Sequence, residues 1–223
     1  MPSMISSNVI IEMIKNKVPF AFTRWGDGEW DCMLNPYYNK KNCDGHVYSP
    51  DVSVALIRTV IRKEACHFRG IQQKAMDMYG QQIMKFLSCN LDYGSWHDAD
   101  IFHKMSETEQ LKPFFDLIKD RRVVWIGNEK EKLSAEAAGW QAIVVRNRES
   151  WLDYSRVLQE CLSVTQPDVY LFCAGFVSKV VIGDMLPFVI PHNLTLLDMG
   201  SVFDPYWGRC TRKYHKNVLE KLK

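Results

Sequence analysis

Val123-Val-Trp-Ile126 and Val169-Tyr-Leu-Phe172 are the two stretches of sequence that decide the fold class. A strand with one face in water alternates apolar and polar residues, whereas a strand buried on both faces is apolar throughout. Continuous apolar runs of this length are typical of central strands in a parallel sheet. The two runs therefore predict a sheet that is covered by helices on both faces.

Strand-like and helix-like segments alternate on either side of these runs. The expected strands are residues 122–126, 141–145, 168–173 and 194–197, and the expected helices are residues 129–138, 150–162 and 177–186. Parallel strands that are joined by helices require right-handed crossovers. We therefore expect an α/β fold of the Rossmann-like type, with a mostly parallel sheet and helices on both faces.

The first half of the chain is less regular. Its pattern predicts helices at 7–16, after Ser49-Pro50 and at 73–88. Strands are expected at 19–24 and 68–71, and irregular structure at 90–104. Residues 34–48 are rich in Asn, Lys, Tyr and Gly, which is typical of a long loop that could act as a lid. Because no repeat or linker divides the chain, we expect one domain, 1–223, with a loop and helical insertion at 34–105.

Composition excludes several classes of protein. The 223 residues are 47% hydrophobic and 24% charged, which is globular rather than disordered usage. The net charge is only +2, so a general nucleic-acid binder is not expected. Residues 209–223 hold six basic residues and one acid, a net +5, which leaves −3 for the rest. This basic tail is interpreted as a solvated face, with contact to an anionic membrane surface or substrate as the alternative.

The cysteines and the N-terminus indicate a reducing compartment. Seven cysteines, an odd number, include no Cys-x-x-Cys pair, which argues against zinc ribbons and redox dithiols. Glu12 interrupts the apolar cluster of residues 1–17, which therefore does not resemble a secretory signal. No apolar stretch reaches the ~18 residues that a membrane-spanning helix needs. We therefore expect a cytoplasmic protein.

The first candidate site follows the strand at 19–24. In open parallel sheets, ligands bind outside the carboxyl ends of the strands. The string Arg24-Trp-Gly-Asp-Gly-Glu29 places Gly26 and Gly28 around Asp27, where they permit sharp turns and close approach of a ligand. Asp27 and Glu29 have the spacing that lets two carboxylates share Mg²⁺ or Mn²⁺, and Arg24 suits phosphate. The alternative is an ordinary turn with a salt bridge.

The second candidate site is the passage from a buried strand through Gly175 into a helix. Backbone N–H groups at a helix start, together with the helix dipole, favour a diphosphate, and Lys179 could add charge. The alternative is an ordinary strand-to-helix turn with a solvated lysine.

The third candidate site follows the last expected strand, in Leu197-Asp-Met-Gly-Ser-Val-Phe-Asp204. Asp198 and Asp204 could orient a ribose, bind a metal through water or act as a general base. Tyr206 and Trp207 offer flat faces to a sugar or base, although packing beneath the C-terminal tail is the favoured interpretation.

Together, these three strings resemble the GT-D-fold glycosyltransferases, first recognised as nucleotide-sugar-dependent glucosyltransferases that elongate glycans on bacterial serine-rich adhesins. The resemblance runs from about residue 20 to residue 207, and the Arg-x-Gly-Asp-Gly-Glu string is its most specific element. It implies a UDP-sugar donor, UDP-glucose first, a glycan or glycosylated-protein acceptor, and Mn²⁺ or Mg²⁺ at Asp27 and Glu29. The residues that it places around the donor and its metal ion are Arg24, Gly26, Gly28, Gly175, Phe176, Lys179, Gly200 and Ser201.

Two positions depart from the family pattern. Phe176 stands where a proline is expected, which we interpret as a packing change. Ser201 stands where a histidine is frequent, which leaves the donor sugar and the identity of the base open.

The implied reaction is hexosyl or pentosyl transfer. Negative charge grows on the leaving diphosphate. Three groups would stabilise this charge: a cation held by Asp27 and Glu29, the guanidinium of Arg24, and the helix start at Gly175. The candidate bases are Asp198, Asp204 and Asp98, whereas His97 and His46 are interpreted as structural or exposed histidines. The alternatives are a metal-dependent hydrolase of nucleotide diphosphates or nucleotide sugars, and a nucleotide-binding module without catalysis.

Overall fold

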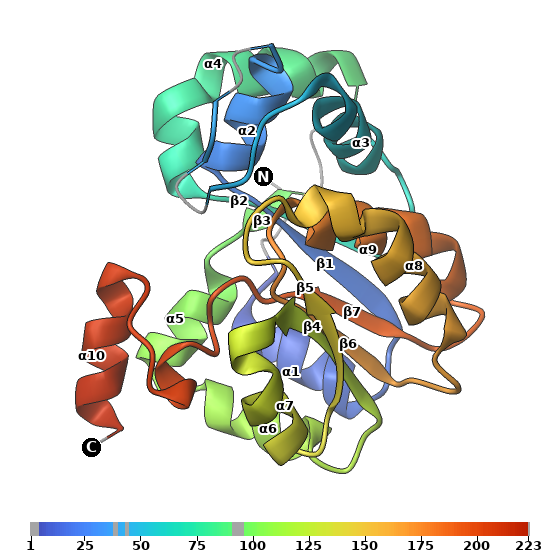
Figure 1. The fold of residues 1–223 in the computed structure, drawn as a ribbon, viewed down its shortest axis with the longest axis vertical. Coiled ribbons are helices and arrows are strands. Elements are labelled where there is room, and N and C mark those ends of the chain that lie inside the picture. Colours follow the sequence, from blue (N-terminus) through green and yellow to red (C-terminus); the bar gives the residue numbers. More distant parts are fainter. Residues whose placement is uncertain (1–4, 38–39, 43–44, 91–95, 223) are drawn as a thin grey trace.

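The computed structural model describes residues 5–37, 40–42, 45–90 and 96–222 (Figure 1). Within these residues one parallel sheet has the strand order β3-β2-β1-β7-β6-β4-β5. Its strands are β1 (Phe20–Trp25), β2 (His67–Ile71), β3 (Trp96–Asp98), β4 (Val123–Asn128), β5 (Gln141–Val145), β6 (Val169–Phe172) and β7 (Thr195–Asp198). The expected α/β fold with a parallel sheet is confirmed.

Helices cover both faces of this sheet, as Figure 1 shows. They are α1 (Ser7–Lys15), α2 (Asp27–Leu34), α3 (Pro50–Val60), α4 (Gln73–Asn90), α5 (Ile101–Glu107), α6 (Leu111–Ile118), α7 (Lys132–Ala137), α8 (Tyr154–Ser163), α9 (Phe176–Val189) and α10 (Lys213–Lys221), with 3-10 turns η1 (Glu129–Glu131), η2 (Ser150–Asp153) and η3 (Pro205–Trp207). Among the described residues, none of the helices combines the length and the apolar character needed to cross a bilayer.

The apolar runs of β4 and β6 divide their side chains between two cores. Val123 and Trp125 pack on the face covered by α1, α5 and α6, whereas Val124 and Ile126 pack on the face covered by α8 and α9. Neighbouring residues of a strand point to opposite faces, so a strand between two helical layers must be apolar at every position. This arrangement is the one that the two runs predicted.

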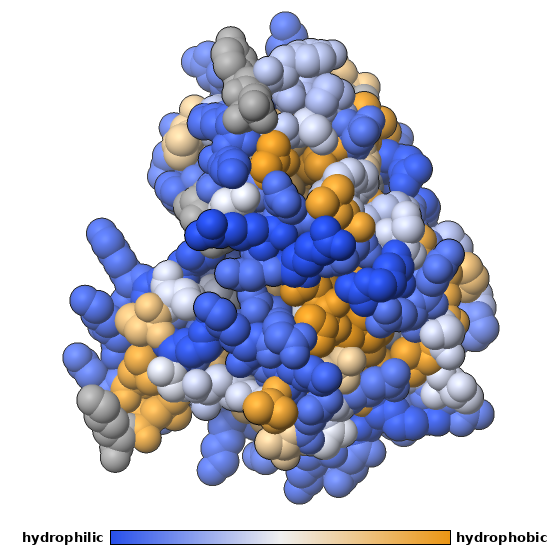
Figure 2. Space-filling model, viewed as in Figure 1, coloured by the Kyte–Doolittle hydropathy of each residue, from blue (hydrophilic) through white to orange (hydrophobic). Residues whose placement is uncertain are grey.

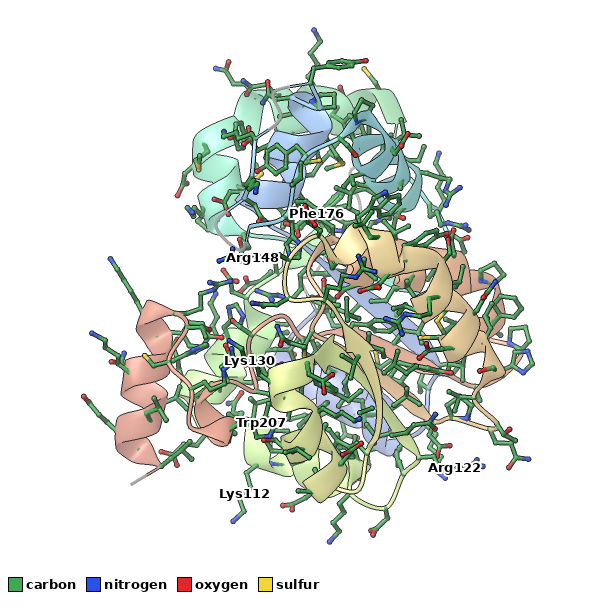
Figure 3. The ribbon with its side chains drawn as sticks, viewed as in Figure 1. Lys112, Arg122, Lys130, Arg148, Phe176 and Trp207 are labelled. Atoms are coloured by element: carbon green, nitrogen blue, oxygen red, sulfur yellow. The ribbon has the colours of Figure 1, made fainter. Side chains whose placement is uncertain are left out.

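A third core lies outside the two faces of the sheet. Helices α2, α3 and α4 gather at the top of Figure 1 and enclose Trp25, Trp30 and Leu56. Phe176, at the start of α9, belongs to this core and lies where it meets the rest of the molecule (Figure 3). The helices of the N-terminal half therefore form a layer next to the carboxyl end of β1.

Three sequence expectations need correction. The glycine-rich string was expected to be a turn, but helix α2 begins at Asp27 with Gly26 as its N-cap. Residues 90–104 were expected to be irregular, but they contain β3 and the start of α5, with 91–95 outside the described residues. The segment 34–105, expected to be a loop and helical insertion, contributes β2 and β3 to the common sheet.

Gly70 provides a test of the packing between β2 and β3. A Cβ at this position would lie 2.6 Å from Ala99 Cα and 2.8 Å from Ala99 N, and backbone atoms cannot rotate away. We expect Gly70→Ala to lower the free energy of unfolding by about 1–3 kcal/mol in urea titrations. The matched control is Gly80→Ala in α4, where a Cβ would meet only Met76 Cε at 3.9 Å. A helical alanine should stabilise there, so equal losses in both variants would contradict this packing.

Candidate active site

A cleft of about 660 Å³ opens at the carboxyl ends of the strands. The turns after β1, β6 and β7, which are the three candidate sites of the sequence, all contribute to its lining. Further walls come from the ends of β4 and β5, from His46 and Tyr48, and from residues 209–214. Figure 2 shows hydrophilic side chains gathered across the middle of this face, between the layer of α2 and α4 and helix α10. The fold therefore brings the three candidate sites together.

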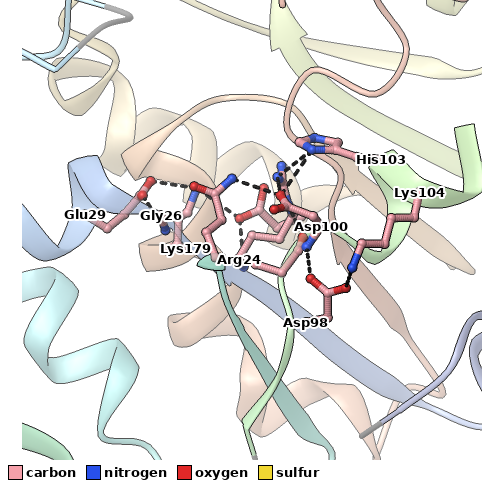
Figure 4. A network of polar contacts seen from close by, with 11 residues as sticks. Arg24, Gly26, Glu29, Asp98, Asp100, His103, Lys104 and Lys179 are labelled. Carbon is pink, nitrogen blue, oxygen red and sulfur yellow. Dashed lines mark hydrogen bonds and ion pairs between the residues drawn. The ribbon is translucent and has the colours of Figure 1, made fainter. Parts of the chain in front are cut away.

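The buried ammonium of Lys179 links the ends of three strands (Figure 4). Its Nζ lies 3.0 Å from Glu29 Oε1, 3.0 Å from Asp198 Oδ2 and 3.3 Å from the Gly175 carbonyl oxygen. Burial alone would lower the pKa of Lys179, but Asp198 and Glu29 raise it above its ordinary value. An ammonium has three hydrogens to donate, and these three oxygens account for all of them. Lys179 was expected to contact phosphate, and in this structure it binds protein oxygens instead.

Glu29 and Asp198 hold backbone groups as well as Lys179. Glu29 Oε2 accepts a hydrogen bond from the N–H of Gly26 at 2.9 Å, which caps α2. Asp198 Oδ2 accepts from the N–H of Arg24 at 3.2 Å. Asp198 has 0% exposed surface, so no acceptor hydroxyl reaches it in this structure. This placement favours a positioning role for Asp198 over the general-base role.

Asp27 points to a different partner from Glu29. Its Oδ2 lies 2.6 Å from Lys74 Nζ, and both side chains are partly exposed on the cleft wall. The two carboxylates of the Asp-x-Glu string therefore pair with different lysines and do not converge on one point. Across the described ranges, no three His, Cys, Asp or Glu side chains are grouped so that they could share a metal ion.

Arg24 presents one edge of its guanidinium to the cleft. Its Nε donates to the Ala99 carbonyl at 2.6 Å, and Nη2 donates to Asp100 Oδ1 at 3.2 Å (Figure 4). These bonds hold the group so that Nη1 lies beside Gly200 on the cleft wall. A fixed guanidinium at a strand end suits a phosphate oxygen.

Two glycines permit this close packing. Gly200 has φ +59°, and a Cβ there would lie 1.9 Å from Arg24 Nη1. Gly175 also has φ +59°, and a Cβ there would lie 2.5 Å from His46 Nε2. Glycine adopts such angles without strain, so both positions require it. Gly26, Gly28 and Ser201, the other small residues expected here, also line the cleft.

The C-terminal segment forms a wall of the cleft. Arg209, Thr211, Arg212 and Tyr214 line it, and the hydroxyl of Thr211 donates to Asp204 Oδ2. Thr211 and Arg212 are exposed, as the interpretation as a solvated face requires, and the same segment also contributes to the cleft lining. Asp204 itself lines the cleft, as the sequence expectation requires, but it is bound by its own neighbours.

Four other expected residues lie outside the cleft lining. Phe176 is buried with Tyr48 in the third core, which agrees with a packing change. Asp98 accepts from the N–H of Asp100 and pairs with Lys104. Tyr206 and Trp207 pack against the apolar core, as was favoured. Figure 3 shows Trp207 in the lower part of the view, away from Phe176 at the start of α9.

Sequence reasoning missed several cleft residues. Asp100 and His103 flank Arg24, with 3.2 Å between Asp100 Oδ1 and His103 Nδ1, and the His103 ring stacks on Tyr214 at 4.6 Å. They lie in the stretch that was expected to be irregular, where no pattern singled them out. His46, interpreted as structural or exposed, is buried against Gly175 and lines the cleft. His97, in contrast, accepts from the Ile5 N–H and has the expected structural role.

Buried neutral histidines make the fold sensitive to acid. Burial lowers the pKa of His67 to about 3 and those of His103 and His215 to about 4, with nearby arginines adding to the effect. The unfolded chain, with pKa near 6.5, binds protons that the folded chain does not, so stability falls as pH drops from 7 to 5. Each such histidine contributes a slope of up to about 1.4 kcal/mol per pH unit.

Urea unfolding at pH 7, 6 and 5 measures this dependence. His67→Gln removes a buried imidazole that is hydrogen-bonded to Thr23. It should reduce the slope of unfolding free energy against pH by up to about 1.4 kcal/mol per pH unit, the contribution of one proton. Stability that is equal at pH 7 and pH 5 would contradict the assignment of these histidines as neutral.

The sequence matches no known family model and no curated protein. The fold, in contrast, is similar to a solved structure of domain of unknown function 1792, described as having a distinct glycosyltransferase fold. The TM-score is 0.70 at 13% identity, over 92% of this chain and 80% of that one. A glycosyltransferase of the same domain type from Streptococcus sanguinis gives 0.70 at 13% identity, over 93% of this chain and 84% of that one.

These comparisons agree with the resemblance seen in the three strings. At such low identity, the likeness establishes the fold and not the reaction. The chain therefore has the glycosyltransferase fold seen in structures of domain of unknown function 1792.

Proposed function

We propose that this protein is a glycosyltransferase that moves a sugar from a nucleotide-diphosphate donor to a hydroxyl of a glycan or a glycosylated protein. The observation that carries the proposal is the cleft, where the turns after β1, β6 and β7 meet on a glycosyltransferase fold. The proposed donor is a UDP-sugar, UDP-glucose first, on the strength of the sequence resemblance. The proposed compartment is the cytoplasm.

The cleft offers positive charge where the leaving group would lie. Arg24, with its Nη1 beside Gly200, and the N-terminal end of α9 at Gly175 line it, and so do Arg209 and Arg212. Charge that develops on a diphosphate is stabilised by cations and helix starts that are already in place. Of the three expected acids, only Asp204 belongs to the cleft lining, and we therefore propose Asp204 as the group that takes a proton from an acceptor.

Of the two carboxylates expected to bind a divalent cation, Asp27 and Glu29, only that of Asp27 is available to do so. Glu29 is bound to Lys179 and to the Gly26 N–H, whereas Asp27 is partly exposed on the cleft wall beside Lys74. Mn²⁺ or Mg²⁺ is usually held by one or two carboxylates plus substrate phosphates. We therefore propose Asp27 as the protein ligand of an ion that arrives with the diphosphate. When bound, such an ion neutralises charge on the leaving group.

The experiment is incubation of the protein with UDP-glucose and other radiolabelled UDP-sugars, with and without glycan acceptors. The proposal expects acceptor-dependent labelling of the glycan and release of UDP. Release of free sugar at the same rate with or without acceptor would establish the hydrolase alternative. Tight UDP binding without turnover on any acceptor would establish a binding module.

A further inference from the structure

The environment of Lys179 has the composition of a cation site. Oxygens from Glu29 after β1, from Asp198 at the end of β7 and from Gly175 after β6 surround its Nζ at 3.0, 3.0 and 3.3 Å. The side chains of Lys179, Glu29 and Asp198 are 7%, 12% and 1% exposed, so water contributes little to this charge balance. Carboxylate and carbonyl oxygens are also the ligands that Mg²⁺ and Mn²⁺ take.

Asp198 provides a second, independent indication. Its Oδ1 is buried and has no hydrogen-bond partner within the described part of the chain. A buried carboxylate with an unbonded oxygen is costly unless a cation is close by, and Lys179 is that cation. Two buried acids with one lysine leave a net charge of −1, so loss of the ammonium would leave two adjacent uncompensated carboxylates.

We propose that the ammonium of Lys179 is a built-in cation that occupies the oxygen site between Glu29 and Asp198, and that Glu29 binds this lysine instead of a metal ion. Lys179 is then a positioning residue. Through Glu29 it fixes the Gly26 N–H, through Asp198 it fixes the Arg24 N–H, and it holds the Gly175 carbonyl directly. The role of these segments in binding a diphosphate rests on the proposed function. The occupancy of the oxygen site by the Lys179 ammonium does not rest on it.

Lys179→Met gives the sharpest test, because it empties the site and keeps an apolar stem of similar length. In the absence of nucleotide, we expect this variant to melt at a lower temperature than wild type and to regain several degrees with millimolar Mn²⁺, since an ion that binds only the folded state stabilises it. Mn²⁺ should change the melting temperature of wild type by less than about one degree. Mn²⁺ bound to each protein is counted by electron paramagnetic resonance.

Two controls separate this site from general metal binding. Lys179→Met combined with Glu29→Gln replaces one of the two carboxylates that the ion would use with a neutral amide, so the Mn²⁺ rescue should be largely lost. Lys74→Met frees the exposed carboxylate of Asp27 and should not create a nucleotide-independent Mn²⁺ site. A folded Lys179→Met variant that gains no Mn²⁺ binding would overturn the proposal.

Glu29→Gln provides a test that does not depend on the folding of the Lys179 variant. With saturating UDP, wild type and Glu29→Gln should bind Mn²⁺ with affinities within about twofold of each other. The reason is that, in our proposal, Glu29 binds Lys179 and is not a ligand of the ion. A tenfold or greater loss in the folded variant would contradict our assignment of Glu29. If wild type binds no Mn²⁺ with UDP, the proposed ion at Asp27 fails, and the nucleotide-free experiment still tests the lysine site.

Discussion

Replacement of Arg24 with methionine is expected to lower sugar transfer on the order of a hundredfold or more. The guanidinium is fixed by Ala99 and Asp100, and its Nη1 faces the cleft beside Gly200. A hydrogen-bond donor group that is held in place before the reaction stabilises charge at the leaving group without any cost of reorganisation. The measurement is kcat and KM for the UDP-sugar that proves active, together with the melting temperature.

The control for this variant is an arginine outside the cleft. Arg58 is exposed on α3 and pairs with Asp184, so Arg58→Met should leave transfer unchanged within about twofold. Wild-type turnover by Arg24→Met would refute the role of Arg24 at the diphosphate. A loss that merely follows the melting temperature would make Arg24 a structural residue.

Replacement of Asp198 with asparagine is expected to have the largest effect on stability. Loss of a hydrogen bond to a buried charged group costs about 1.5–3 kcal/mol, and Lys179 keeps Glu29 as its remaining acidic partner. Asp198 is fully buried and binds both Lys179 and the Arg24 N–H. We expect the free energy of unfolding, measured in urea, to fall by about that amount.

Asp27→Asn is the matched comparison for Asp198→Asn. It breaks the pair with Lys74, whose side chain is 66% exposed, and an exposed pair is worth about 0–1 kcal/mol. Equal losses in the two variants would contradict the description of Asp198 as the buried partner of Lys179.

The central sheet was predictable from local sequence. Val123 and Val124 belong to a run that has no polar position, and only a strand between two helical layers places every such side chain in a core. The same reasoning placed the cleft, because the polar residues after such strands must lie at one edge of a parallel sheet.

Helix α2 was not predictable in the same way. Gly26-Asp27-Gly28 reads as a turn, since glycine and aspartate disfavour helix interiors. The helix forms because Trp30 and neighbouring apolar side chains are buried in the third core and because Glu29 caps the Gly26 N–H. Tertiary packing here outweighs local preference, and it acts through residues distant in sequence.

The ion-pair partners of Asp27 and Glu29 could not be predicted from the sequence either. Spacing alone favoured a shared metal ion for Asp27 and Glu29, because two carboxylates two residues apart can face one point. On a helix, residues two apart point in different directions, and α2 starts at Asp27. Glu29 therefore faces Lys179 while Asp27 faces Lys74.

Calorimetric titration of UDP-glucose into wild type and Arg24→Met tests most directly whether the cleft at the strand ends binds a nucleotide-diphosphate sugar. Our account predicts saturable binding to one site per chain in wild type, weakened about tenfold or more in Arg24→Met, which corresponds to about 1.4 kcal/mol or more. Absence of binding in wild type, or equal affinity in the two proteins, would contradict it.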